Sequence, residues 1–169
     1  MARVRTLSPA ELDDYLCTAG RRRWGWGEVD CFLFVADWVE RVTGVDCAGE
    51  YRGAYASERE ARRLIKLNAG PVAFAGALLA RAGYVETAGP QAGDVALVRV
   101  AFGCGVSPSR NLVFPGMTEK ASAPQRRVVF GPVGAILRRP GFWAVKPSDA
   151  PGLVFANFPV IQAWTLPHD

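Results

Sequence analysis

The run Trp24-Gly25-Trp26-Gly27-Glu28-Val29-Asp30-Cys31 constrains the fold more than any other stretch of the chain. Its two glycines predict a tight turn, because glycine tolerates backbone conformations that other residues avoid. The aromatic residues of the run either form a wall beside the cysteine or only pack on the core. Asp30 is a residue type that caps helices, since its side-chain oxygen accepts hydrogen bonds from free N–H groups of the first turn. Apolar residues then recur at helical spacing as far as Gly44: Leu33, Val35, Val39 and Val42. The run therefore predicts a helix with the Cys31 thiol in its first turn.

Length and composition favour one globular domain over residues 1–169. The chain has 169 residues, half of them apolar, together with 18 Gly and 12 Pro, which is typical of a loop-rich protein with a single core. The N-terminus has no apolar signal core, and no apolar run reaches the roughly 18 residues that a membrane span requires. We expect no signal peptide, no membrane span and synthesis in the cytoplasm.

The first half of the chain reads as helices. Ser8-Pro9-Ala10-Glu11 combines a capping residue, a proline at the first helical position and a glutamate at the third, which predicts a helix from Pro9 to Ala19, ended by Gly20. Ser57 to Glu60 repeats the capping pattern ahead of an apolar stripe that reaches Leu67. Pro71 opens a further helix that ends near Gly83.

The second half reads as strands, so the order of elements predicts an α+β fold with helices packed on an antiparallel sheet. Short runs rich in Val, Ile and Phe lie between Gly and Pro residues at 95–100, 112–114, 128–130, 134–137, 142–145, 153–156 and 160–166. Residues at about 99–130 form an insertion, and its proline-rich part from Ser107 to Gln125 is either an interaction arm or a surface loop.

Cys31 is the candidate nucleophile. A helix N-terminus favours the thiolate through its dipole and free N–H groups, but the adjacent Asp30 carboxylate favours the neutral thiol. A working cysteine enzyme also needs a base, and the single histidine, His168, stands next to the C-terminus, where we expect a solvated tail residue.

The other cysteines carry no motif. Cys17, Cys47 and Cys104 are far apart in the sequence and form no Cys-x-x-Cys pair, so we expect small buried hydrophobic residues and no metal or other cofactor. The net charge of +4 is spread over short arginine groups without regularly interleaved aromatic residues. Nucleic-acid binding is therefore not expected.

Three elements carry a family resemblance: Trp26-Gly27 to Asp30-Cys31, then Gly93-Asp94-Val95, then Val133-Gly134. Together they resemble the papain-like NlpC-type peptidase superfamily, in which Asp-Cys opens the central helix and a histidine begins the strand corresponding to Val133-Gly134. A narrower similarity is to NlpC-like proteins of unknown function encoded among the tail genes of siphophages and gene transfer agents. It rests on further elements: Asp37-Trp38, Val42 to Asp46, Tyr51-Arg52-Gly53, Tyr55 and Ala163-Trp164.

One departure from the superfamily pattern bears on activity. The residue at the position of the catalytic histidine is Pro132, and neither Gly131 nor Val133 beside it can accept a proton. The third polar member of the triad would fall near Ala144 to Lys146, where no His or Asn is present. The narrower family also tends to lack the histidine, so only Cys31 transfers as a site residue, as a vestigial nucleophile.

The resemblance implies a structural or assembly component of a phage-type tail tip or baseplate, built on a degenerate peptidase fold. Its partners would be the hub, the distal tail protein and the central fibre, with Trp143 as an exposed contact residue and peptidoglycan as a further contact. The alternative is an active cysteine hydrolase that cleaves peptidoglycan peptides with an unconventional or partner-supplied base. A third hypothesis, a metal or iron–sulfur protein, would require Cys17, Cys31, Cys47 and Cys104 to converge.

Overall fold

The computed structural model describes residues 8–103, 128–148 and 151–167. Helices come first and most of the sheet follows, so the predicted α+β class is confirmed. The helical part comprises α1 (Pro9–Arg21), α2 (Cys31–Thr43), the short 3-10 helix η1 (Gly49–Tyr51), α3 (Glu58–Leu67) and α4 (Pro71–Arg81). The strands are β1 (Val85–Thr87), β2 (Val95–Gly103), β3 (Val128–Arg139), β4 (Phe142–Val145), β5 (Val154–Ala156) and β6 (Val160–Thr165).

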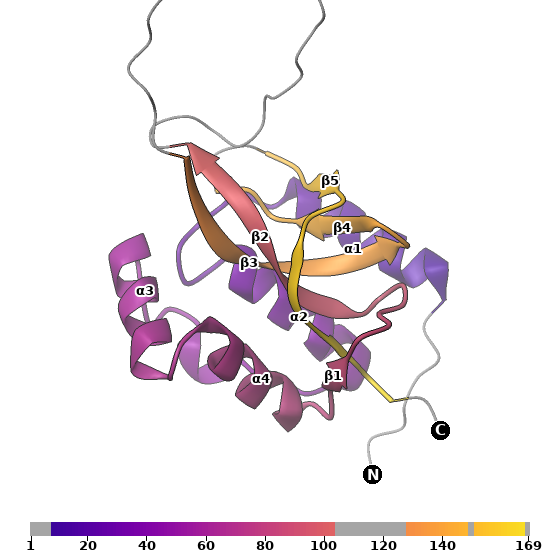
Figure 1. Cartoon of the computed structure of the whole chain (residues 1–169), viewed down its shortest axis with the longest axis horizontal. Helices are drawn as coiled ribbons and strands as arrows, with labels where there is room; N and C mark the ends of the chain where they lie inside the picture. Colours follow the sequence, from indigo (N-terminus) through magenta and orange to yellow (C-terminus); the bar gives the residue numbers. More distant parts are fainter. Residues whose placement is uncertain (1–7, 104–127, 149–150, 168–169) are drawn as a thin grey trace, which may run out of the picture.

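All strand pairs of the sheet are antiparallel, as predicted, and the order across the sheet is β1-β6-β2-β3-β4-β5. The last strand, β6, returns to lie beside β2, which makes the long β2–β3 pair the centre of the sheet (Figure 1). Helix α2 packs against β3, and α4 packs against β1 and β6. The centre of the sheet is thus the support on which the candidate site is built.

Helix α1 begins where the sequence predicts, with a complete capping box between Ser8 and Glu11. It does not end at Gly20 but continues to Arg21, because the carbonyls of its last turn find partners elsewhere in the chain. The buried ammonium group of Lys146 donates to the carbonyls of Ala19 and Arg22, and Gly152 N–H donates to the Gly20 carbonyl. These tertiary hydrogen bonds offset the low helix propensity of glycine.

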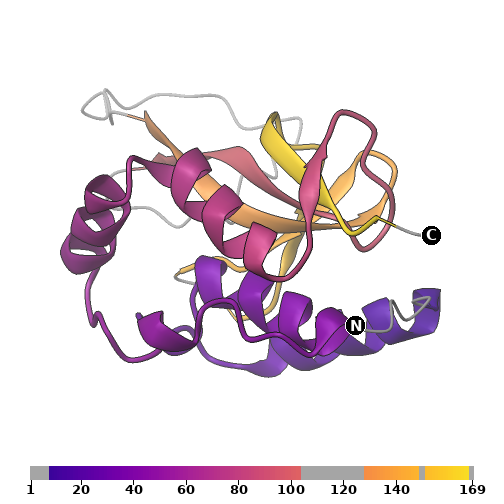
Figure 2. The ribbon, with the colours of Figure 1, turned by 90° about the horizontal axis from the view of Figure 1, so that it is seen from below.

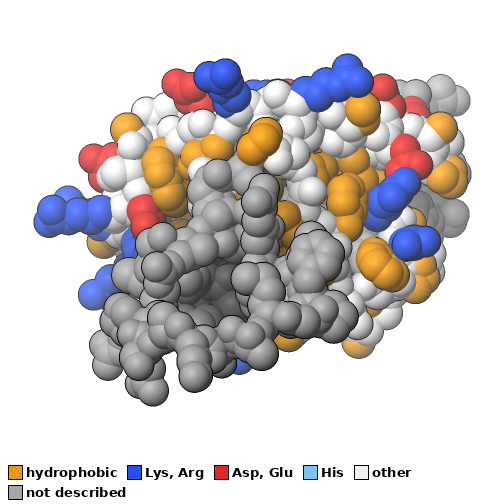
Figure 3. All heavy atoms as spheres, turned by 90° about the horizontal axis from the view of Figure 1, so that it is seen from above, with side chains coloured by type: hydrophobic (Ala, Val, Ile, Leu, Met, Phe, Trp, Pro, Cys, Tyr) orange, Lys and Arg blue, Asp and Glu red, His pale blue; other side chains and the backbone are white. Residues whose placement is uncertain are grey.

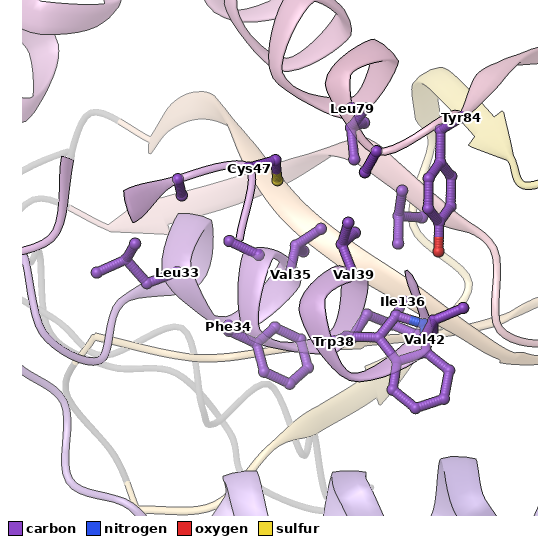
Figure 4. Packing of buried hydrophobic residues seen from close by; sticks show 14 of the residues in the cluster. Leu33, Phe34, Val35, Trp38, Val39, Val42, Cys47, Leu79, Tyr84 and Ile136 are labelled. Atoms are coloured by element: carbon purple, nitrogen blue, oxygen red, sulfur yellow. The ribbon is translucent and has the colours of Figure 1, made fainter. Parts of the chain in front are cut away.

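Helix α2 is the central helix, and both of its predicted ends are confirmed: Asp30 caps its start, and Gly44 ends it in a left-handed conformation. Phe34 and Trp38 lie on one side of the helix, where Tyr15 of α1 packs on both rings. Val35 and Val39 lie on the other side, towards α4 (Figure 4). The Trp38 indole N–H donates to the Gly93 carbonyl at 2.8 Å, so α2 is tied to the start of β2.

Helices α3 and α4 flank the same face of the sheet but differ in burial. Phe74, Leu78 and Leu79 of α4 are buried in the core, whereas α3 has no buried residue. In Figure 2 α1 and α2 lie side by side along one side of the sheet, while α3 projects at the margin of the molecule. The chain passes from α3 to α4 through Ala69 and Gly70, both with positive φ.

Two strands differ from the prediction. Residues 128–130 and 134–137 are parts of one strand, β3, which pairs with β2 without interruption from Val95↔Ile136 to Gly103↔Val128. The predicted insertion at 99–130 therefore begins and ends inside the two central strands, and residues 104–127, with the predicted strand at 112–114, lie outside the described residues. Strand β1 (Val85–Thr87) was not predicted, because three residues with no alternating apolar pattern carry little strand signal.

The two faces of the sheet carry separate apolar clusters. One joins the helices to Val95, Ile136 and Trp164, and the other lies on the opposite face around Val98, Ala135 and Trp143. Trp143 is only 3 % exposed, so the expectation that it is an exposed contact residue is wrong. It follows the alternation of β4, in which Trp143 shares its face with Val145 while Ala144 joins the helical side.

Charged side chains are spread over the surface. On the face shown in Figure 3, lysine and arginine side chains alternate with acidic ones around the rim, and hydrophobic side chains are exposed between them. Several charges form ion pairs, including Arg41 with Asp14 and Arg138 with Asp13. No helix in the described part of the chain is both long and apolar enough to span a bilayer.

Candidate functional site

Asp30 organises the site around the start of α2. Its side chain is 1 % exposed, and both carboxylate oxygens are fully engaged. One oxygen accepts from the N–H groups of Phe32 and Leu33 at 3.0 and 2.9 Å. The other accepts from Gly27 N–H at 3.0 Å and from the Tyr55 hydroxyl at 2.5 Å. Asp30 therefore joins three segments: the preceding turn, the helix and the 51–55 loop.

The Trp-Gly-Trp-Gly run forms the tight turn predicted for it, with Gly25 bridged to Val29. Gly27 is required at its position, since its φ is +72° and a Cβ there would lie 2.1 Å from the Tyr55 carbonyl oxygen. Its own carbonyl accepts from Gly53 N–H at 2.8 Å. The turn thus holds the 51–55 loop against the start of α2, and Trp26 forms part of the wall beside Cys31.

Cys31 lies in the first turn of α2, as predicted, and packs against β3. A Cβ at Gly134 would lie 2.5 Å from the Cys31 carbonyl oxygen and 2.9 Å from Val35 Cγ2, so the close approach of helix and strand depends on this glycine. Burial, followed by the negative charge of Asp30, raises the pKa of the Cys31 thiol to about 12. Hydrogen bonds from the backbone of Gly134 and the first helical turn act in the opposite direction but do not compensate.

The thiol has no base among the described residues around it. Pro132 lines the same cavity as Cys31, and a proline side chain cannot accept a proton. Asp30 is occupied by four donors, and Tyr55 donates its own proton to Asp30, with burial raising the pKa of the phenol well above its usual range. His168 lies outside the described residues. The thiol is therefore held neutral, which does not suit a nucleophile.

A cavity of about 120 Å³ adjoins the thiol. It lies between α2, α3, α4 and the centre of the sheet, and apart from Asp30, Tyr55 and two cysteines its described lining is made of apolar side chains and Gly134. Sequence reasoning missed this cavity, because its wall comes from the start of α2, the segment that follows α2, helices α3 and α4, and three strands. The only signal available was the apolar stripe of α3, formed by Ala61, Leu64 and Ile65.

The remaining motif residues have structural roles. Asp46 accepts from Ala48 N–H in the turn after α2, as expected, and also pairs with Arg52. Arg52 bonds in addition to Asp37 and Glu40 of α2, and its guanidinium lowers the pKa of Asp46. Asp94 accepts from Gln91 N–H at 2.7 Å at the start of β2, which is the role expected for it.

The described cysteines do not form one cluster: Cys47 lines the same cavity as Cys31, whereas Cys17 lies elsewhere on α1. Cys47 is buried in the helical core, as predicted, but Cys17 is exposed on α1, contrary to expectation. The apolar stripe of α1 is turned towards α2 through Leu12, Tyr15 and Leu16, which leaves Cys17 on the outer side. Cys104 lies outside the described residues, and within the described ranges no three His, Cys, Asp or Glu side chains are placed to bind a metal ion.

Comparison with known families places the chain. The profile of a domain of unknown function, DUF6950, matches residues 5–131, which is more than half of the sequence. The chain belongs to the DUF6950 family. The matched region of this DUF6950 member contains the Asp30 junction, Cys31 and the α-helices α1 to α4 of the described residues, and it ends just before Pro132. No curated protein and no solved structure gives a significant match.

Proposed function

We propose that this DUF6950 protein is a structural or assembly component of a phage-type tail tip or baseplate, built on an NlpC-type, papain-like fold whose peptidase site has decayed. The fold assignment is supported by the position of Cys31 at the first turn of a central helix that packs on a central strand. The tail assignment rests on the sequence resemblance. Partners would be the hub, the distal tail protein and the central fibre in the virion, with peptidoglycan as a further contact.

The state of the thiol supports the loss of catalysis. Raising the pKa of Cys31 to about 12 leaves on the order of one molecule in 10⁵ with a thiolate at pH 7. In working cysteine enzymes a neighbouring imidazole or cationic group lowers this pKa instead. By the sequence resemblance, Pro132 stands where the superfamily has its histidine, and the carboxylate of the adjacent Asp30 opposes ionisation of the thiol.

The alternative is a cysteine hydrolase that acts on peptidoglycan peptides with a base supplied by a partner. The cavity beside Cys31 favours this hydrolase hypothesis, because a substrate group in the cavity could reach the sulfur. A general base is typically worth about 10² to 10⁴ in rate, so a chain without one would turn over its substrate very slowly until the partner bound.

Two measurements separate these functions. Purified protein, alone and with tail-tip partners, is incubated with peptidoglycan beside its Cys31→Ala variant, and released peptides are quantified by mass spectrometry. The structural proposal expects no difference between the two proteins. Release that disappears with the substitution, with or without partners, would establish the hydrolase instead.

Particle assembly tests the structural role directly. Deleting the gene from its phage or gene-transfer-agent cluster should abolish infectious or transducing particles, and complementation with Cys31→Ala should restore them to the wild-type titre. Normal tails formed without the protein would exclude a structural role. Complementation by wild type but not by Cys31→Ala would point to chemistry at the sulfur.

A further inference from the structure

The cavity beside Cys31 runs from the surface into the core. Its inner end is formed by Val95, Leu79 and Trp164, which are 0, 5 and 2 % exposed. At its outer end Pro132 is exposed, and Ala61 of α3 is half-buried. A group that enters beside Pro132 would therefore pass between α3 and the sheet and come into contact with Cys31.

The cavity wall offers a ligand hydrocarbon contacts and almost no polar ones. The carboxylate and phenol in the wall, from Asp30 and Tyr55, already bond to each other, and no fully buried side-chain nitrogen or oxygen among the described residues lacks a partner. Apolar cavities bind hydrocarbons: an enclosed, engineered one of about 150 Å³ accepts benzene. A volume of about 120 Å³ therefore suits a group of about five or six carbons.

A cation stands at the open end. Arg99 of β2 pairs directly with Pro132 of β3, and side chains of such a pair lie on the same face with Cβ atoms about 5 Å apart. Its neighbours on either side, Val98 and Val100, are buried on the opposite face, whereas Arg99 is exposed. The Arg99 side chain has no hydrogen-bond or ion-pair partner within the described part of the chain, so its charge is available to an anion at the mouth.

We propose that the cavity is a binding site for a short aliphatic carboxylate, with its alkyl chain against Val35, Phe74 and Leu97 and its carboxylate at the mouth beside Arg99. The assignment combines an apolar interior with a single cation at the entrance. Binding is non-covalent, since Cys31 only contributes to the wall. The site is independent of any role in tail assembly.

The test uses the intact protein and a series of straight-chain carboxylates from butanoate to octanoate. Bound ligand should slow alkylation of Cys31 by N-ethylmaleimide, read by peptide mass spectrometry, and raise the thermal midpoint. Each further buried methylene should strengthen binding about fourfold, with the gain ending near six carbons. Cys17, which is exposed on α1 away from the cavity, should be alkylated at an unchanged rate.

Variants separate the two halves of the site. Ala75→Leu fills the cavity from α4, and Ala61→Leu fills it from α3. Each variant should abolish the protection of Cys31 by hexanoate. If one variant does not fold, the other still tests the site. Arg99→Gln should weaken hexanoate about two- to fivefold while leaving hexan-1-ol unchanged. Leu67→Ala, on the exposed side of α3, is the matched control and should bind like the wild type.

Several outcomes would overturn the proposal. Absence of saturable binding, equal protection of Cys31 and Cys17, or unchanged binding in both filled variants would exclude the cavity as a site. Equal affinity for hexanoate and hexan-1-ol, together with no effect of Arg99→Gln, would exclude the carboxylate and leave a neutral hydrocarbon as the ligand. Because none of these readouts depends on particle formation, their failure is distinct from failure of the assembly role.

Discussion

Helices α2 and α3 begin in the same way but differ in how many of their residues are buried. Both begin at a side-chain cap, Asp30 for α2 and Ser57 for α3. Helix α2 buries seven residues and holds the site, whereas α3 buries none and covers the cavity with one apolar stripe. A cap thus fixes where a helix begins, but tertiary packing decides how strongly it is held. The rigid wall of the cavity is α2, and the wall most easily displaced is α3.

The largest difference in the free energy of unfolding is expected between substitutions of the two helix caps. Asp30→Ala should lower the free energy of unfolding by about 4 kcal/mol, because it removes the cap and leaves the buried Tyr55 hydroxyl and Gly27 N–H without an acceptor. Ser57→Ala, at an exposed cap, should cost about 1 kcal/mol. Urea denaturation measures both, and equal losses would contradict the role of Asp30 as a junction.

A matched pair of leucines tests burial alone. Leu33→Ala on α2, where the side chain is fully buried, should cost about 3 kcal/mol, since it removes apolar contacts and leaves a cavity. Leu67→Ala on α3, where the side chain is 75 % exposed, should stay within about 0.5 kcal/mol of the wild type. Similar values at the two positions would mean that α3 is packed as firmly as α2.

The contact between α2 and β3 can be tested at one glycine. Gly134→Ala should cost about 2 kcal/mol, because its Cβ would lie 2.5 Å from the Cys31 carbonyl oxygen and force the helix away from the strand. Gly89→Ala is the control, since a Cβ there meets nothing within 4 Å. If both variants have the same urea midpoint of unfolding as the wild type, the start of α2 does not approach β3 as closely as the structure shows.

The last prediction concerns pH, where the effect per pH unit is small and builds up gradually. The thiol of Cys31 has a pKa of about 12 in the folded chain and about 8.5 when unfolded, so the unfolded state loses its proton first. Stability relative to Cys31→Ala should therefore be constant below pH 8 and should fall by about 1 kcal/mol per pH unit between pH 9 and 11. Parallel curves for the two proteins from pH 7 to 11 would mean that the folded thiol ionises normally.

Local signals in the sequence were sufficient for elements whose ends are set by their own residues. Asp30 and Gly44 mark α2, and the Ser8 box marks the start of α1, because each acts within one turn of itself. The rest depends on distant partners. The continuation of α1 past Gly20 requires Lys146, and the burial of Trp143 requires the opposite face of the sheet. Neither relation leaves a periodic pattern in the sequence.

The candidate site divides in the same way. The positions of Cys31 and Pro132 could be read from motif order, and the effect of Asp30 on the thiol follows from its charge alone. The hydrogen bond from Tyr55 to Asp30 joins residues 25 positions apart, and the cavity wall gathers residues from α2, α3, α4 and the strands β2, β3 and β6. These contacts form only when the chain is packed, so the sequence of no single segment predicts the cavity.

The hydrogen bonds around Asp30 also bear on how an Asp-Cys signature should be interpreted in other chains. Substituting the cysteine would leave this junction intact, whereas substituting the aspartate would break it. The two residues of the signature are therefore constrained for different reasons, the aspartate by folding and the cysteine by any chemistry at its sulfur. The aspartate supports the fold through these hydrogen bonds, whether or not a chain has any turnover. A search that counts the pair as one catalytic mark would therefore assign peptidase activity to chains that kept only the architecture.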